Sequence, residues 1–84
     1  MYIHLGDETI IRVAEIVAIF DIAIESTSKL TKQYTTRAIE DKRAEIIKDG
    51  AIKSIVVTKD KIYFSPISSI TLKKRANQHL VIEL

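Results

Sequence analysis

The chain has 84 residues, with two glycines, one proline and no cysteine. This length predicts a single domain over residues 1–84, and the lack of cysteine excludes disulfides and thiolate metal sites. A domain of this size has a marginal core, and small proteins commonly add a disulfide, a metal or a partner subunit. Self-association is therefore the first expectation.

The net charge of +2 is unevenly distributed along the chain. Residues 1–42 carry five basic and seven acidic side chains, whereas residues 43–84 carry eight basic and four acidic ones. A basic C-terminal half suits a surface that meets a polyanion, although a solvated surface of mixed charge has the same composition. The longest apolar stretch, residues 16–24, is far shorter than the roughly 20 residues of a membrane span, and the N-terminus has no leader pattern. We expect a cytoplasmic protein without membrane contact.

The first third of the chain is predicted to form strands. Residues 2–5 alternate before Gly6-Asp7, which is typical of a strand and a turn, and residues 9–12 form a second strand. Residues 13–15 either turn the chain or belong to a helix over 12–20, but β-branched residues favour a strand over 16–24. In that strand one face would hold Ile16, Ala18, Phe20, Ile22 and Ile24, and the other Val17, Ile19 and Ala23.

A charged helix is predicted to follow, with N-caps available at residues 26–28. A thin apolar stripe repeats at Leu30, Tyr34 and Ala38. Two positions for the C-terminal end of this helix fit the sequence. The helix either continues to Lys48 and stops at Gly50, or stops near Asp41 and is followed by a strand over 44–48 that enters an Asp49-Gly50 hairpin. The isoleucines on both sides of Asp49-Gly50 favour the hairpin.

The C-terminal half predicts a strand over 52–58, a turn over 59–61 and a returning strand over 62–64. Ser65-Pro66 has the pattern of an N-cap followed by proline at the first helical position, which predicts a second helix through residues 72–76. Residues 79–84 would be a strand or an arm that docks on a neighbour. The predicted fold class is α+β, with a small, mostly antiparallel sheet and two helices.

Two of the predicted strands are apolar on both faces. Ile55 and Val57 fall on one face of the strand over 52–58, and Val56 falls on the other. Two thin helices would cover one face of a sheet, so the other face would meet another subunit unless the sheet curls to bury both. We therefore expect a homo-oligomer. The expected interface residues are Ile16, Phe20, Ile22, Ile55 and Val57.

No pattern indicates catalysis, a metal or a cofactor. His4 and His79 lie at opposite ends of the chain and form no ligand set. Glu40-Asp41 fits a solvated helix face, and Gly6 and Gly50 form no phosphate-binding loop. We expect a protein that is not an enzyme and that uses no metal or cofactor.

Nucleic acid is the better candidate ligand. Lys73-Lys74-Arg75 is a compact basic run, whereas Lys59 and Lys61 suit the protection of edge strands. Because no helix-turn-helix, zinc finger or RNP-type motif is present, contacts to backbone and shape are expected rather than base readout. The predicted phosphate contacts are Arg12, Lys53, Lys73, Lys74 and Arg75.

Several segments together resemble one known family. They are MYIHLG at 1–6, IVAIFD at 16–21, KSIVVT at 53–58, IYFSPISS at 62–69 and TLKKR at 71–75. This pattern is similar to the RemA/RemB family of bacterial regulators of extracellular-matrix (biofilm) genes, and within it to the RemB group. The resemblance implies small DNA-binding activators whose dimers are similar to LytTR-type DNA-binding domains. It also implies assembly into rings around which promoter DNA wraps.

The sequence departs from RemA-type chains at three basic positions. A RemA-type arginine pair falls on Gly50 and Ala51, and a further arginine falls on Glu15, whereas Lys53 keeps its charge. Two hypotheses follow. The first is a cytoplasmic, nucleoid-associated ring homo-oligomer that binds double-stranded promoter DNA and regulates matrix genes. The alternative is an oligomeric interaction protein that does not bind DNA and acts through a RemA-like partner.

Overall fold

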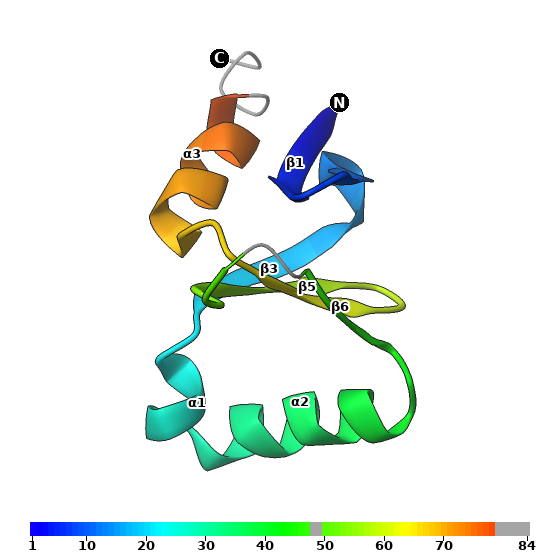
Figure 1. The fold of residues 1–84 in the computed structure, drawn as a ribbon, viewed down its shortest axis with the longest axis vertical. Helices are drawn as coiled ribbons and strands as arrows, with labels where there is room; N and C mark the ends of the chain where they lie inside the picture. Colours follow the sequence, from blue (N-terminus) through cyan, green and yellow to red (C-terminus); the bar gives the residue numbers. More distant parts are fainter. Residues whose placement is uncertain (48–49, 79–84) are drawn as a thin grey trace.

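The computed structural model describes residues 1–47 and 50–78, which form three layers (Figure 1). A four-stranded sheet in the order β3-β5-β6-β4 is the middle layer. The two-stranded sheet β1-β2 and helix α3 lie on one of its faces, and helices α1 and α2 lie on the other (Figure 1). The predicted α+β class with a mostly antiparallel sheet is confirmed. Residues 79–84, predicted to be a strand or an arm, lie outside the described residues.

The N-terminal strands form the predicted pair. Strands β1 (Tyr2–Gly6) and β2 (Thr9–Arg12) are antiparallel, and Ile3 lies opposite Ile11. The turn between them requires positive φ angles at Gly6 (+123°) and Asp7 (+50°), which glycine and aspartate tolerate better than most residues. The predicted turn at residues 13–15 is a 3-10 helix, η1 (Val13–Glu15).

Strand β3 (Ile16–Asp21) is shorter than the predicted strand over 16–24. The Asp21 carboxylate accepts a hydrogen bond from the Ala23 amide at 2.8 Å, which turns the chain into helix α1 (Ile24–Thr27). The side chain of Ile16 was also assigned to the wrong face of this strand. A bulge between Ile16 and Ala18 shifts the register, so Ile16 packs on the same side of the sheet as Ile19, and away from Phe20.

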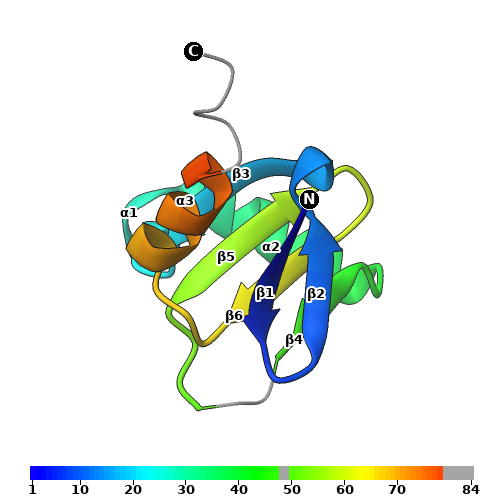
Figure 2. The same cartoon turned by 90° about the horizontal axis from the view of Figure 1, so that it is seen from above.

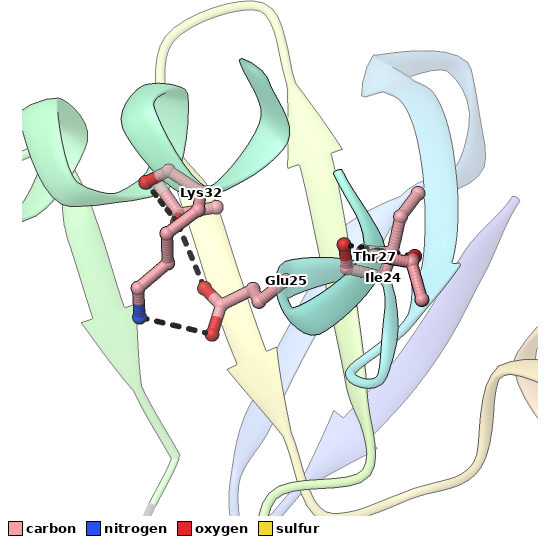
Figure 3. Close-up of polar contacts among 5 residues, drawn as sticks. Ile24, Glu25, Thr27 and Lys32 are labelled. Carbon is pink, nitrogen blue, oxygen red and sulfur yellow. Dashed lines mark hydrogen bonds and ion pairs between the residues drawn. The ribbon is translucent and has the colours of Figure 1, made fainter. Parts of the chain in front are cut away.

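Helix α2 (Lys29–Glu40) begins at one of the predicted caps. The Ser28 hydroxyl accepts a hydrogen bond from the Thr31 amide at 3.1 Å. Of the predicted stripe, Ala38 is buried, but Leu30 and Tyr34 are exposed. The carboxylate of Glu25 in α1 lies 2.8 Å from the Thr35 hydroxyl and 3.5 Å from the Lys32 ammonium, so it joins the two helices (Figure 3).

The helix ends near Asp41, as one of the two alternatives predicted, and strand β4 (Ala44–Ile46) follows. The predicted Asp49-Gly50 hairpin is wrong. Strand β4 pairs parallel with β6, so β6 separates it from β5 in the sheet. The chain thus crosses from one edge of the sheet to an interior position, which a two-residue turn cannot do.

Strands β5 (Ser54–Thr58) and β6 (Ile62–Ser65) form the predicted antiparallel pair. The helix after them, α3 (Ser69–Gln78), begins later than predicted. Its cap is Ser68, whose hydroxyl accepts from the Thr71 amide at 3.2 Å. Ser65 ends β6 instead, and its buried hydroxyl donates to the Leu5 carbonyl at 2.5 Å.

Both faces of the central sheet are covered within one subunit. On the side of β1, β2 and α3, a cluster forms around Leu5, Val56 and Leu72. On the side of α2, a second cluster forms around Ala38, Ile55 and Phe64. Figure 2 shows α3 beside the β1-β2 pair. Together these elements cover the face of the central sheet that we expected another subunit to cover. The apolar pattern of β5 therefore reflects a two-sided core and does not by itself require a partner subunit.

Candidate nucleic-acid interface

Helix α3 presents positive charge on its outer face. Leu72 is fully buried and Ala76 is 9% exposed, so this i, i+4 pair fixes the inner face against the sheet and hairpin. Lys73 and Lys74 consequently point outward and are exposed. The helix contains three basic residues and no acidic one. A cationic helix face without carboxylates suits contact with phosphates.

Arg75 has a different environment from the two lysines. It is partly buried, and its Nη1 donates a hydrogen bond to the His4 carbonyl oxygen at 3.1 Å. This bond holds α3 against β1, which also places the basic helix next to the N-terminal hairpin (Figure 2). Arg75 therefore positions the helix, and part of its donor capacity is already used.

Arg12 lies in the same layer as α3. The buried residues of the hairpin, Ile3, Leu5 and Ile11, point toward the sheet, which leaves Arg12 exposed on the outer side of β2. Its register partner on β1 is Tyr2. The layer formed by α3 and the hairpin thus brings together four of the five cations predicted to bind DNA.

Lys53 is placed apart from that layer, at the end of the central sheet. Its amide donates to the Ser65 carbonyl at 2.8 Å, and its carbonyl accepts from the Ile22 amide at 3.0 Å. The backbone is therefore fixed between the ends of β3 and β6, while the side chain is exposed. A ligand that touched Lys53 and α3 together would have to extend over the sheet end.

None of the five cations is paired with a carboxylate among residues 1–47 and 50–78. The ion pairs found there are Lys32–Glu25 at 3.5 Å, Arg43–Asp41 at 3.7 Å and Lys61–Glu45 at 3.7 Å. The pairing of Lys61 agrees with its predicted role as a surface charge. Lys73 and Lys74, in contrast, have their charge available for an external anion.

The three positions at which the resemblance implies arginines carry no positive charge on the surface. Gly50, Ala51 and Glu15 are all exposed. Burial raises the pKa of the Tyr63 phenol, and the nearby carboxylates of Glu45 and Glu15 raise it further against the opposing effect of Lys61. Glu15 therefore contributes negative charge near Tyr63.

The predicted interface residues do not form one surface. Phe20 and Val57 are half-buried in a groove of about 320 Å³ beside α2, and Ile55 forms part of its lining. Ile55 is fully buried within one subunit, and its role at an interface stays a prediction. Ile16 packs on the opposite face of the sheet, and Ile22 lines a second groove of about 250 Å³.

Three exposed apolar residues at the first groove were missed as interface candidates. Val17 is 64% exposed, Leu30 79% and Tyr34 44%, and all three line it. The apolar stripe Leu30-Tyr34-Ala38 indicated such a groove, because a helix face with so few apolar side chains cannot fill the space above the sheet. The bulge that turns Val17 toward α2 had no signal in the sequence.

Other kinds of site find little support in the part of the chain that the structure describes. There, no three histidine, aspartate or glutamate side chains converge as metal ligands would. Likewise, none of the helices over residues 1–47 and 50–78 combines the length and apolar character that crossing a membrane requires.

Comparison with known proteins identifies the family. A model of the RemA-like family, described as extracellular matrix regulatory protein A-like, matches residues 2–76, which include every strand that the structure describes and most of α3. Extracellular matrix regulatory protein B of Bacillus subtilis (strain 168) is 41% identical over 78 residues, covering 90% of each chain. The predicted resemblance is confirmed, and the chain belongs to the RemA-like family of extracellular matrix regulatory proteins.

Proposed function

We propose that this protein regulates extracellular-matrix genes by binding double-stranded promoter DNA through the outer face of α3. The observation that carries the proposal is a helix with three cations, no carboxylate and two fully outward lysines, Lys73 and Lys74. Cations of this kind neutralise backbone phosphates and release counterions, which gives binding that weakens steeply with salt. The family supports the regulatory role.

Assembly is the second part of the proposal. One subunit offers few phosphate contacts, and a ring of identical subunits would repeat them around one DNA segment. The apolar groove beside α2, bordered by Val17, Leu30 and Tyr34, is the surface that we assign to contact between subunits. Since α2 and α3 lie on opposite faces of the sheet, subunit contacts at this groove would leave the basic helix free (Figure 1).

The test is DNA binding by the double variant Lys73→Gln/Lys74→Gln, measured by fluorescence anisotropy on a labelled matrix-gene promoter fragment. We expect wild-type affinity to fall by orders of magnitude between about 50 and 200 mM salt. In the variant the slope of log K against log salt should be smaller by about 2 per bound subunit. Salt-independent binding, or none at the lower salt, would overturn the proposal.

A matched control removes the same charge elsewhere. Lys29→Gln/Lys59→Gln replaces one exposed lysine on α2 and one in the β5–β6 turn. We expect its salt slope to stay near the wild-type value, because neither lysine belongs to the α3 layer. Equal losses in the two double variants would mean that net charge, and not the α3 face, drives binding.

The second candidate function is regulation through a RemA-like partner without DNA contact. It is favoured by the exposed and uncharged Gly50 and Ala51, which stand where RemA-type chains have arginines. Co-purification of the two proteins, together with no anisotropy change on promoter DNA at about 50 mM salt, would support this function over the first.

A further inference from the structure

The outer face of the β1-β2 hairpin carries a compact group of exposed side chains that the proposed function does not use. Burial alternates along both strands, with Ile3, Leu5 and Ile11 inside. Tyr2 and His4 on β1 and Ile10 and Arg12 on β2 are consequently outside. Tyr2 is directly opposite Arg12, and His4 is opposite Ile10. We call these four residues the ribbon face.

The ribbon face is continuous with the basic helix. Arg75 of α3 donates to the His4 carbonyl at 3.1 Å, so the helix is in direct contact with β1, the nearer strand of the hairpin (Figure 2). Helix α3, which contains Lys73 and Lys74, lies in the same layer as the hairpin (Figure 2). A ligand bound along the outer face of α3 would therefore also reach the hairpin.

The composition of the Tyr2–Arg12 end of the ribbon face suits contact with DNA. Tyr2, 62% exposed, combines an apolar ring with a hydroxyl, and its cross-strand partner is a cation. Two paired strands are about 4.8 Å apart, and the major groove of B-DNA, about 12 Å wide, admits a ribbon of two strands. The acidic Asp7 and Glu8 lie in the turn at the other end of the hairpin, which favours contact through the Tyr2–Arg12 end.

We propose that the Tyr2–Arg12 end of the ribbon face enters the major groove of duplex DNA that is held by α3. Arg12 contacts a backbone phosphate, and the Tyr2 ring packs against the groove wall. This inference rests on the proposed function and extends it from one helix to two elements. The contacts are independent of base sequence, so they add affinity on any duplex.

The two residues have different signatures in a salt titration, which makes the proposal testable. Arg12→Gln removes an ionic contact and should lower the slope of log K against log salt by about 1 per bound subunit. Tyr2→Ala removes a non-ionic contact and should weaken binding about tenfold at every salt concentration, with the slope unchanged, because the apolar burial of the ring is lost. Both changes should appear equally on a promoter duplex and on a scrambled duplex.

Matched controls lie on the opposite side of the sheet. Lys29→Gln removes an exposed cation of α2, and Ile39→Ala trims a half-exposed apolar side chain of the same helix. Neither should change affinity or slope. Circular dichroism and the oligomer mass by light scattering should be the same for all four variants and the wild type.

The outcomes separate this inference from the function on which it rests. If the wild type binds no duplex, the proposed function itself fails. If Lys73→Gln/Lys74→Gln loses binding while Tyr2→Ala and Arg12→Gln keep both affinity and slope, α3 binds DNA but the ribbon face does not. That result would refute only the proposed role of the ribbon face. A changed oligomer mass in Tyr2→Ala with unchanged DNA affinity would show a subunit contact instead and would also refute it.

Discussion

At the scale of single residues, Gly6 is a position where the N-terminal hairpin closely approaches the link between β6 and α3. It has a φ of +123°, and a Cβ there would lie 2.9 Å from Pro66 Cγ and 3.2 Å from Ile47 Cγ2. Real Cβ atoms essentially never come within 3.0 Å of another heavy atom. The link between β6 and α3 can pass over the hairpin only because Gly6 has no side chain.

We predict that Gly6→Ala destabilises the fold by roughly 3 kcal/mol, from backbone strain together with the clash against Pro66. Gly50→Ala is the matched control. Gly50 also has a positive φ, +107°, but a Cβ there would meet nothing within 4 Å, so only the strain of roughly 1 kcal/mol applies. Urea denaturation of the two variants measures the difference. Equal decreases in the free energy of unfolding would mean that the close approach to Pro66 does not contribute to the destabilisation.

The residue at which α3 begins could not be predicted from the sequence. Ser65-Pro66 has the local pattern of a helix start, and so does Ser68. The Ser65 hydroxyl donates to the Leu5 carbonyl and accepts from the Ile67 amide at 3.0 Å, whereas the Ser68 hydroxyl accepts from the Thr71 amide and caps the helix. A partner 60 residues away in sequence is invisible to any local pattern.

At the scale of elements, α2 is held on the sheet by few contacts of its own. Thr35 and Ala38 are its only buried residues, so its position depends strongly on α1. The Glu25 carboxylate, 17% exposed, bridges the helices through the Thr35 hydroxyl and the Lys32 ammonium (Figure 3). Because the lysine is well solvated, the hydroxyl contact is the stronger part of this link.

Thr35→Val should therefore destabilise the protein by about 1–2 kcal/mol, because it leaves a poorly solvated carboxylate oxygen without its donor. Valine has nearly the same shape, so packing changes little. Thr36→Val, at the exposed neighbouring position, should cost almost nothing. Thermal unfolding by circular dichroism compares the two. A Thr35→Val protein as stable as the Thr36→Val protein would show that Glu25 does not hold α2 in place.

Elements with a local pattern were predicted correctly, and those that depend on long-range pairing were not. The β1-β2 and β5-β6 pairs have short turns between alternating strands, and both were found in the sequence. Strand β4 has three residues, and its parallel partner β6 lies beyond β5 in the chain. Asp49-Gly50 matched a hairpin signal there, but tertiary pairing overrode it.

At the scale of the whole molecule, one subunit buries more of its apolar strand residues internally than the sequence led us to expect. The apolar residues of β5 lie in two internal clusters, so the case for self-association now rests on surface exposure. Part of that exposure lies at the groove between α2 and the edge strand β3, where Val17 and Leu30 are mostly exposed. An apolar groove of this kind suits a subunit contact.

We predict that Leu30→Lys breaks the proposed assembly without unfolding the subunit, since Leu30 is 79% exposed. Light scattering should give a mass close to the 9.5 kDa of one chain, against a multiple of it for the wild type. DNA affinity should fall as well, because avidity is lost. Ile70→Lys, which places the same charge at an exposed position of α3, should keep the wild-type mass. A wild type that is itself monomeric at micromolar concentration would contradict the assembly.

The candidate DNA surface was predicted in part. The run Lys73-Lys74-Arg75 is contiguous in sequence, so its helix and charge could be predicted directly. Arg12 was predicted only as an exposed strand end, and it shares a layer with α3 because the Arg75–His4 bond holds the hairpin against the helix. Sequence alone could not separate Lys53, which lies at the sheet end, from the four cations that share one layer.

The hydrogen bond between Ser65 and Leu5 also has a consequence for how the chain acquires its shape. It closes a loop of 60 residues, and the Arg75–His4 bond closes one of 71, whereas β5 and β6 are joined by a short turn. Loop-closure entropy favours local contacts first, so the β5-β6 hairpin should form early and the N-terminal hairpin should dock late. The layer assigned to DNA would then be completed in the last folding step, and partly folded chains would present no such surface.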